Sequence, residues 1–354
     1  LAQFNHQSLI ATKTSRIVRA AKGRPVSDFG ARRAHNMDAA VYGARAAYIG
    51  GAAGSATVLS GKMFGIPISG TMAHSWVMYH DSEYEAFASY ARLYPAGTVL
   101  LIDTYDVLRS GTPNAIRCAK EVLEPMGQRL KGVRLDSGDL AYLTKEVRKM
   151  LDAAGLEDCK IVASNSLDEY SISSIIDQGG CIDAFGVGER LITSKSAPVF
   201  GGVYKLSAIE DANGNIIPKI KISENTAKIT NPHFKKVYRI YSKDTGKAEA
   251  DLICIHDETI DTSLPLTIFD PVYTWKSKTY ENYELRLLLE PIFKDGKLVY
   301  KRPTTAEIRA YCKEQLAMLW DEVKRFDNPH NYYVDLSQKL YDIKQELLTK
   351  NSGK

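Results

Sequence analysis

Polar side chains and glycines recur along the chain directly after short apolar runs, and their types suit one kind of ligand. Hydroxyl, amide and carboxylate groups bind sugar hydroxyls, and glycine lets a backbone approach a ligand closely. In parallel α/β folds, the ends of successive strands meet at one site. These polar residues and glycines therefore predict a site for a heavily oxygenated ligand. The groups are Ser69, Thr71 and His74; Asp103, Thr104 and Asp106; Asp136, Ser137, Gly138 and Asp139; Ser164, Asn165 and Ser166; and Gly186, Gly188 and Glu189.

Three of these motifs allow more than one interpretation. Asp136-Ser-Gly-Asp139 offers two carboxylates beside backbone N–H groups, which suits ribose hydroxyls or Mg²⁺, but Asp139 is equally well placed to cap a helix. Gly186-Val-Gly188 suits a phosphate, although the same pattern also forms tight turns. Arg32 and Arg33 follow Phe29-Gly30 and suit phosphate or carboxylate recognition, with solvated surface charge as the alternative.

Histidine is the residue whose chemistry depends most on its setting. His74 lies just past an apolar run, where it can act as acid, base, metal ligand or nucleophile toward phosphate. A lone histidine is more often structural, and this alternative stays open from the sequence alone. His35 and His80 lie beside or within helical patterns, and we expect both to be structural.

A repeated unit of apolar run, polar turn and helical pattern positions these residues between about residues 65 and 190. This βα repetition predicts parallel strands, either as a barrel or as an open sheet. Expected helix caps are Asn36, Asp81 and Asp139, with Pro113 near another helix start and 53–64 as a shorter helix. The expected strands are 66–69, 99–103, 132–136, 160–163 and 182–186.

After about residue 200 the pattern changes to an antiparallel, β-rich one and then to a helical one. Expected strands are 203–209, 217–222, 237–242 and 250–256, and 304–348 is expected to be helical with a loop at 328–335.

Composition excludes several classes of protein. The chain of 354 residues is 44% hydrophobic and 25% charged, as in ordinary globular proteins, and no stretch is long and apolar enough to predict a membrane helix. A net charge of +4 suits small anionic substrates and falls short of a nucleic-acid binder. The five cysteines are widely spaced, which argues against zinc or disulfides and favours the cytoplasm. No signal peptide is expected after Leu1.

The motifs, taken in order, resemble the nicotinate phosphoribosyltransferase family of type II phosphoribosyltransferases. The resemblance implies an α/β fold, an irregular (β/α) barrel with a partial second α/β domain. The matching segments are Phe29-Gly-Ala-Arg-Arg33, Ser69-Gly-Thr-Met-Ala-His74, Asp103-Thr-Tyr-Asp106, Arg134-Leu-Asp-Ser-Gly-Asp139, Ala163-Ser-Asn-Ser166, Phe185-Gly-Val-Gly188 and Asn328-Pro-His-Asn-Tyr-Tyr-Val-Asp-Leu-Ser337.

The resemblance also implies a reaction and its partners. Nicotinate and phosphoribosyl pyrophosphate give nicotinate mononucleotide and pyrophosphate, with Mg²⁺ and coupled to ATP hydrolysis, in the salvage route to NAD. The family analogy makes His74 a phosphohistidine whose phosphate helps organise Mg²⁺ and pyrophosphate. It also implies a cytoplasmic homodimer, with no nucleic-acid or membrane partner.

Site roles follow from the same resemblance. Arg134 and Asp136 act with His74 as catalytic residues at the ribosyl and base site, with Mg²⁺ near Asp136 and Asp139. Arg32, with Arg33 beside it, should meet an anionic group, and the pair is the obvious partner for the nicotinate carboxylate. The remaining expected substrate-binding residues are Phe29, Ser69, Thr71, Asp106, Ser137, Asp139, Ser164, Asn165, Gly186 and Gly188.

The chain departs from the family pattern at its start. Family members begin with a long segment that carries an Asp-x-Tyr type motif. The aromatic residue of this motif stacks on the pyridine ring, often across a dimer interface, and we expect the segment to be lacking here. The expected domains are 1–28, a remnant of the N-terminal domain and linker; 29–205, the barrel with the active site; 206–270, β-rich; and 271–354, mostly helical.

Other functions are also compatible with a barrel. Quinolinate or nicotinamide phosphoribosyltransferase would use the same barrel with a site at the strand ends, but the 69–74 and 328–330 segments resemble the nicotinate enzyme more. A Schiff-base aldolase needs a lysine at a strand end, and neither Lys160, at a strand start, nor Lys195, in a polar stretch, meets this need. A non-catalytic, nucleotide-binding remnant of the family is the alternative outside enzymology.

Overall fold

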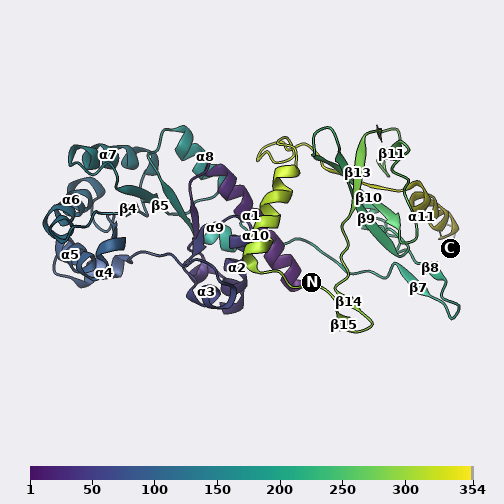
Figure 1. Ribbon diagram of the computed structural model, residues 1–354, viewed down its shortest axis with the longest axis horizontal. Helices are drawn as coiled ribbons and strands as arrows, with labels where there is room; N and C mark the ends of the chain where they lie inside the picture. The colour runs from purple at the N-terminus through teal and green to yellow at the C-terminus, as the bar shows by residue number, and fades with distance from the viewer. Residues whose placement is uncertain (352–354) are drawn as a thin grey trace. The chain divides into compact units, whose positions relative to one another are not determined.

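The computed structural model describes residues 1–351, and these fall into two compact units. The first unit comprises Leu1–Gly201 and Pro303–Lys313, and the second comprises Gly202–Arg302 and the chain from Glu314 onward (Figure 1). No helix among the described residues is both long and apolar enough to cross a membrane. The four domain boundaries expected from the sequence stay a prediction.

A six-stranded parallel sheet organises the first unit. Its strands run in the order β2-β1-β6-β5-β4-β3, and every neighbouring pair is parallel. Val133, Ile161 and Phe185 are buried, as expected for a sheet covered on both faces. The strands are β1 (Val26–Asp28), β2 (Gly54–Ser55), β3 (Val99–Leu101), β4 (Gly132–Leu135), β5 (Lys160–Ala163) and β6 (Ala184–Val187).

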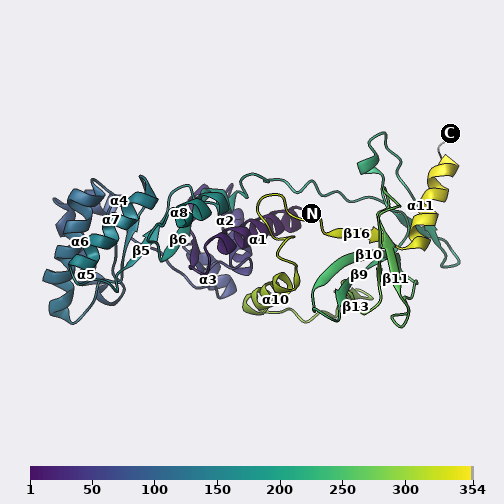
Figure 2. The ribbon, with the colours of Figure 1, turned by 90° about the horizontal axis from the view of Figure 1, so that it is seen from above.

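The helices of the first unit gather in two groups with sheet strands between them. Figures 1 and 2 show α4 to α7 together beyond β4, and α1, α2, α8 and α9 together near β6. The helices are α1 (Ala2–Ala20), α2 (Met37–Ile49), α3 (Val58–Phe64), α4 (His74–Tyr79), α5 (Glu83–Leu93), α6 (Thr112–Cys118), α7 (Leu140–Ala153), α8 (Glu169–Asp177) and α9 (Glu189–Ile192).

Side-chain caps start several of these helices. Asn36 accepts a hydrogen bond from the N–H of Ala39 at the start of α2, and Asp139 accepts one from Tyr142 at the start of α7. Both predicted caps are confirmed. The predicted cap Asp81 is wrong, because the neighbouring Ser82 accepts the N–H of Glu85. Asp and Ser are equally good caps, so composition alone does not decide between neighbours.

The predicted α/β class with a parallel sheet is confirmed, but two details of the sheet differ from expectation. Residues 66–69 make a single parallel bridge, from Ile68 to Ser55, in place of the expected strand. Within residues 1–351 no ladder joins β3 to this segment, so the pairings form an open run. Strands β1 and β2 were not predicted, because they are too short to show a period.

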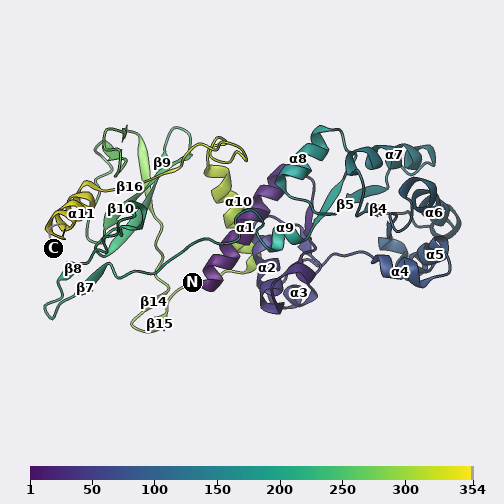
Figure 3. The ribbon, with the colours of Figure 1, turned by 180° about the vertical axis from the view of Figure 1, so that it is seen from behind.

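The second unit is built on a four-stranded mixed sheet. Its order is β13-β9-β10-β16, antiparallel except for the parallel β10–β16 pair. Ile240, Leu252 and Tyr283 lie in its core. Leu340 of α11 and Ile255 of β10 belong to a second buried cluster, and Figure 3 shows α11 beside β10 and β16. The elements are β7 (Ala208–Glu210), β8 (Ile216–Pro218), β9 (Lys235–Ser242), β10 (Ala248–Ile255), β11 (Leu266–Phe269), β12 (Ser277–Tyr280), β13 (Tyr283–Leu287), β14 (Phe293–Lys294), β15 (Lys297–Leu298), β16 (Tyr333–Leu336) and α11 (Gln338–Asn351).

The family-like segment 328–337 has a structural place in this second unit. Its Tyr332 hydroxyl donates to Asp251 at 2.8 Å, and Asp251 forms a two-bond ion pair with Arg239. The expected loop there contains β16, because these residues pair with β10. Residues 203–206, expected to be part of a strand, lie outside any strand.

The helix α10 (Thr305–Met318) begins in the first unit and ends in the second. In the first unit, the Arg309 guanidinium donates to the carbonyl oxygens of Tyr48, Gly51 and Ala52. It therefore satisfies the backbone acceptors left open at the end of α2.

Candidate active site

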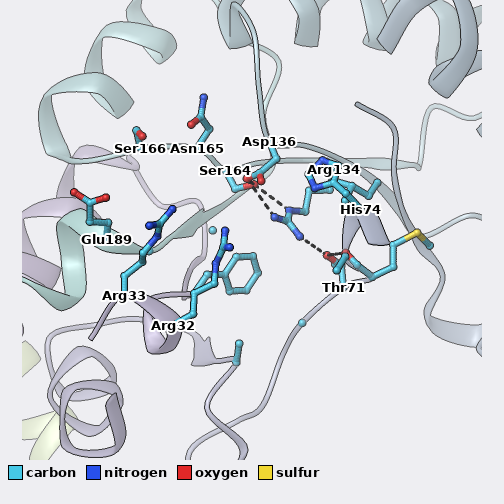
Figure 4. Close-up of a pocket in the computed structure, with 18 residues that line it drawn as sticks. Arg32, Arg33, Thr71, His74, Arg134, Asp136, Ser164, Asn165, Ser166 and Glu189 are labelled. Carbon is cyan, nitrogen blue, oxygen red and sulfur yellow. Dashed lines mark hydrogen bonds and ion pairs between the residues drawn. The ribbon is translucent and has the colours of Figure 1, made fainter. Parts of the chain in front are cut away.

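A cavity of about 400 Å³ opens at the carboxyl ends of the parallel strands in the first unit (Figure 4). Segments after β1, β2, β4, β5 and β6 all contribute to its wall, as the strand-end rule predicts. Most of the expected site residues line it: Phe29, Arg32, Arg33, Thr71, His74, Arg134, Asp136, Ser164, Asn165, Gly186 and Gly188.

Arg134 is fixed at the centre of the cavity. Its guanidinium donates to Ser164 Oγ at 2.9 Å and to Thr71 Oγ1 at 2.8 Å, and it lies 3.2 Å from Asp136 Oδ1 (Figure 4). Its carbon Cζ also lies 5.3 Å from the centre of the Phe29 ring. A cation held in one geometry costs no further ordering when an anionic ligand arrives.

His74 is held by a buried carboxylate. Its Nε2 lies 3.1 Å from Asp103 Oδ1; the Asp103 side chain is 1% exposed, whereas the imidazole is 39% exposed. The other Asp103 oxygen, Oδ2, accepts the backbone N–H of Asp136 at 3.0 Å and the Ser137 hydroxyl at 2.6 Å. Asp103 therefore ties His74 to the end of β4.

A second buried carboxylate shapes the other end of the cavity. Asp28 accepts the N–H of Gly30 and the Ser55 hydroxyl, each at 2.8 Å. Burial raises the pKa of this carboxyl. Gly30 precedes the 3₁₀ turn Ala31–Arg33, so Asp28 sets the start of the segment that carries both arginines.

Arg32 and Arg33 stand exposed at this end. Within residues 1–351, neither guanidinium donates a hydrogen bond or forms an ion pair at contact distance. Both are therefore available to an anion, which favours the binding interpretation over solvated surface charge.

Two glycines and two strained residues bring backbone close to the cavity. A Cβ on Gly186 would lie 2.4 Å from the Phe29 ring, so only glycine fits there. Asn165 and Ser166 have φ values of +103° and +47°. Such backbone costs of order 1–3 kcal/mol per residue and clusters at ligand sites.

Four predicted residues do not line this cavity. Ser69 donates to Ser27, and Asp139 caps α7. Asp106 caps the turn of helix at Val107–Gly111, and Ser137 donates to Asp103. Asp106 and Ser137 line a neighbouring cavity of about 460 Å³, whose wall also contains Asp103, the partner of His74.

Several residues that shape the site received no role from the sequence. Asp103, Ser166 and Glu189 were visible as polar strand-end residues, whereas Asp28 gave no signal because its strand is too short to show a period and its partner Ser55 is distant in sequence. Glu189 lines the cavity. An ion pair with Lys195, with Arg33 nearby, holds the pKa of the Glu189 carboxyl below its usual value.

The donor groups bear on the expected Mg²⁺ site. No cluster of three or more His, Cys, Asp or Glu side chains suited to a metal occurs among the described residues. Mg²⁺ commonly takes only one or two carboxylates and completes its shell with water and substrate phosphates. Asp136 fits this role from the cavity wall, whereas Asp139 serves its own helix.

A cavity at the strand ends of a parallel sheet, with unpaired arginines beside it, defines an α/β enzyme that handles anionic, hydroxyl-rich substrates. The nicotinate phosphoribosyltransferase (NAPRTase) family model matches residues 25–245, and the nicotinate phosphoribosyltransferase C-terminal domain model matches residues 234–344. The chain belongs to the nicotinate phosphoribosyltransferase family.

Individual relatives agree with this membership. The nicotinate phosphoribosyltransferase of Bacillus subtilis is 47% identical over 97% of this chain and 69% of that protein. The crystal structure of human nicotinic acid phosphoribosyltransferase superposes with a TM-score of 0.80 at 27% identity, over 97% of this chain and 74% of that one. Nicotinate-nucleotide pyrophosphorylase from Pyrococcus furiosus gives a TM-score of 0.66 at 29% identity, over 89% and 71%.

Proposed function

We propose that this chain forms nicotinate mononucleotide and pyrophosphate from nicotinate and phosphoribosyl pyrophosphate, coupled to ATP hydrolysis, and that the strand-end cavity is where it does so. Family membership supports the reaction. One observation carries the location: a carboxylate-held histidine, a fixed arginine and two unpaired arginines border the same cavity.

The Asp103 bond supports a role for His74 as phosphate acceptor. A carboxylate accepts a hydrogen bond from Nε2–H, which keeps the proton on Nε2 and leaves the lone pair on Nδ1. Nδ1 would then attack the γ-phosphorus of ATP, forming a P–N bond as the P–O bond to ADP breaks. Asp103 would stabilise the resulting positive imidazole ring.

Phosphoribosyl transfer depends more on stabilising charge on the ribose and on the leaving pyrophosphate than on acid–base chemistry. Positive charge develops on the ribose as pyrophosphate leaves, so groups that hold both partners in line lower the barrier. Arg134 is placed to meet the leaving pyrophosphate or the ribosyl group, and Asp136 and Ser164 are placed to accept or donate hydrogen bonds to hydroxyls. Mg²⁺, when bound by Asp136 and the diphosphate, would supply positive charge to the leaving group.

The backbone at Gly186, Gly188 and Asn165 lines the cavity, and two of these residues carry no side chain that would keep a ligand away, so this part of the wall suits the 5′-phosphate. Arg32 and Arg33 suit the nicotinate carboxylate. An amide in place of that carboxylate would lack the charge attraction to the two arginines, so the pair would favour nicotinate over nicotinamide.

Assembly and location follow the family resemblance. We propose a homodimer in the cytoplasm; sedimentation of the purified chain tests the first statement, and fractionation of cells tests the second.

The reaction is tested by forming mononucleotide from labelled nicotinate, phosphoribosyl pyrophosphate, ATP and Mg²⁺, with His74→Ala in parallel. His80→Ala is a matched control, because His80 bonds the carbonyl of Trp76 and lies outside the cavity wall. Product from the wild type and the control, but little from His74→Ala, supports the proposal. Full activity in His74→Ala, or none from the folded wild type, contradicts it.

A further inference from the structure

Two loops of the cavity wall lie on either side of one ion pair. The first loop joins β5 to α8 and contains Asn165 and Ser166, both with positive φ. The second joins β6 to α9 and contains Gly188. Because serine rarely adopts positive φ, and because the φ of Asn165 lies well beyond the left-handed region that asparagine tolerates, a neighbouring interaction must hold the first loop in place.

Asp168 lies directly after the strained loop and makes bonds in two directions. Its Oδ1 accepts the N–H groups of Tyr170 and Ser171 and so caps α8. Its Oδ2 lies 2.5 Å from Nη1 of Arg190, which stands in the first turn of α9 after the second loop. The Asp168 carboxylate therefore joins the β5–α8 loop both to α8 and to the start of α9, which follows the β6–α9 loop.

The environment of this ion pair strengthens it. The Asp168 side chain is 13% exposed and that of Arg190 31%, so water screens the pair less than it screens a surface bridge. Burial acts to raise the pKa of Asp168, but the Ser171 and Arg190 hydrogen bonds outweigh it and hold the pKa below its ordinary value. The carboxylate is therefore charged at neutral pH.

Arg190 also acts on the arginine turn through its helix. Ile192, two residues further along α9, is buried, and its Cβ would lie 2.5 Å from a Cβ on Gly30. Gly30 is the residue before the turn that carries Arg32 and Arg33. A displacement of α9 would consequently move three parts of the wall together: the Asn165 loop, the Gly188 loop and the arginine turn.

We propose that Asp168 and Arg190 are a positioning pair for phosphoribosyl pyrophosphate, which fixes the spacing of the two backbone loops that meet its phosphate. This inference rests on the proposed function of the cavity. Neither residue lines the cavity wall, so both act through the loops they join.

The test uses Asp168→Asn, Arg190→Met and the double variant of the full chain. Asparagine keeps the α8 cap and loses the charge toward Arg190, and methionine breaks the pair without touching the cap. Arg190→Lys restores the charge. The matched control is Asp177→Asn with Lys22→Met, which removes an exposed ion pair at the far end of the same helix.

Three quantities are measured: KM for phosphoribosyl pyrophosphate, kcat, and amide hydrogen exchange at residues 165–167 and 188–190. We expect each single variant to raise this KM by about 5- to 20-fold with kcat changed less than about threefold, and to speed exchange in both loops. The double variant should be no worse than either single one, Arg190→Lys should recover most of the loss, and the control should match the wild type.

An unchanged KM and unchanged exchange in both single variants would overturn the inference. A lower melting temperature with unchanged KM would also overturn it, since that result describes a purely structural bridge. If the wild type does not bind phosphoribosyl pyrophosphate at all, the proposed function fails, and the exchange measurement then decides about the pair alone.

Discussion

Asp28 and Asp103 are two buried carboxylates built on the same plan at different places along one sheet. Asp28 ends β1, and Asp103 follows β3. Each accepts a backbone N–H group and a serine hydroxyl: Gly30 and Ser55 in one case, Asp136 and Ser137 in the other. In both cases a strand end is tied to a segment of the cavity wall.

The two carboxylates differ in their third partner. Asp103 also holds the partly exposed imidazole of His74, whereas the hydrogen bonds of the Asp28 side chain within residues 1–351 are with Gly30 and Ser55. A buried carboxylate thus supports chemistry when it orients a titratable group at the cavity, and supports architecture when it orients only backbone and hydroxyl groups.

The largest expected effect separates the two carboxylates directly. In Asp103→Asn, the amide N–H₂ would face Nε2 of His74 and favour the tautomer with its proton on Nδ1, which removes the proposed nucleophile. We expect kcat to fall by roughly 10²- to 10³-fold, measured as mononucleotide formation. An unchanged melting temperature shows that the loss is chemical. Retention of full kcat would mean that Asp103, like Asp28, has only a structural role.

A smaller effect is expected at Gly186, which contacts Phe29, the residue of the cavity wall that follows Asp28 in the chain. In Gly186→Ala, the new methyl group would lie 2.4 Å from the Phe29 ring and force it to move from beneath Arg134. We expect unfolding free energy to fall by about 1–3 kcal/mol and KM for phosphoribosyl pyrophosphate to rise by roughly tenfold. Gly188→Ala is the milder control, since its methyl group would stand 3.3 Å from the Phe29 carbonyl oxygen.

Asp28→Asn should affect catalysis less than either change. The amide oxygen can still accept the Gly30 N–H, and its NH₂ can donate to Ser55, so we expect kcat within about threefold of wild type. A fall as large as that of Asp103→Asn would erase the proposed difference between the two carboxylates.

The pH dependence of stability provides a further test at the same position. Because burial raises the native pKa of Asp28, its contribution to stability is full below the unfolded value and is lost as pH rises through the native pKa. Asp28→Asn should remove this loss, so urea unfolding between about pH 4 and about pH 8 should show a flatter profile.

The smallest effect is expected in the second unit, which contains neither of these carboxylates. Burial, with Asp270 nearby, raises the pKa of Asp335 to about 6. Its contribution to stability is therefore lost as pH rises from about 4 through about 6, and Asp335→Asn should gain about 1 kcal/mol above that range. KM and kcat should stay unchanged, and a change in either would connect this residue to the reaction.

The periodicity of apolar residues and the helix-capping residues predicted much of the first unit. The apolar runs at β3 to β6 and the caps Asn36 and Asp139 are local signals, and local signals are readable from one sequence. Strands of two or three residues such as β2 and β1 carry no period, so pairing with distant segments decides them. The choice between Asp81 and Ser82 depends on helix register, which composition does not fix.

The candidate site was predictable to a similar extent. The strand-end rule brought Asp136 and Ser164 together because it follows from topology, whereas Arg134 was predicted from the family resemblance. It did not separate residues that face the cavity from those that face their own helix, as Asp139 does. Asp28 and the Asp168–Arg190 pair were not predicted, because their partners are brought close only by folding.

The most direct test follows the transfer of labelled phosphate from ATP to the protein in wild type, His74→Ala, Asp103→Asn and Asp28→Asn. The account predicts an acid-labile label on His74 in the wild type and in Asp28→Asn, strongly reduced label in Asp103→Asn and none in His74→Ala. Label that persists in His74→Ala, or that is lost equally in Asp28→Asn and Asp103→Asn, would contradict it.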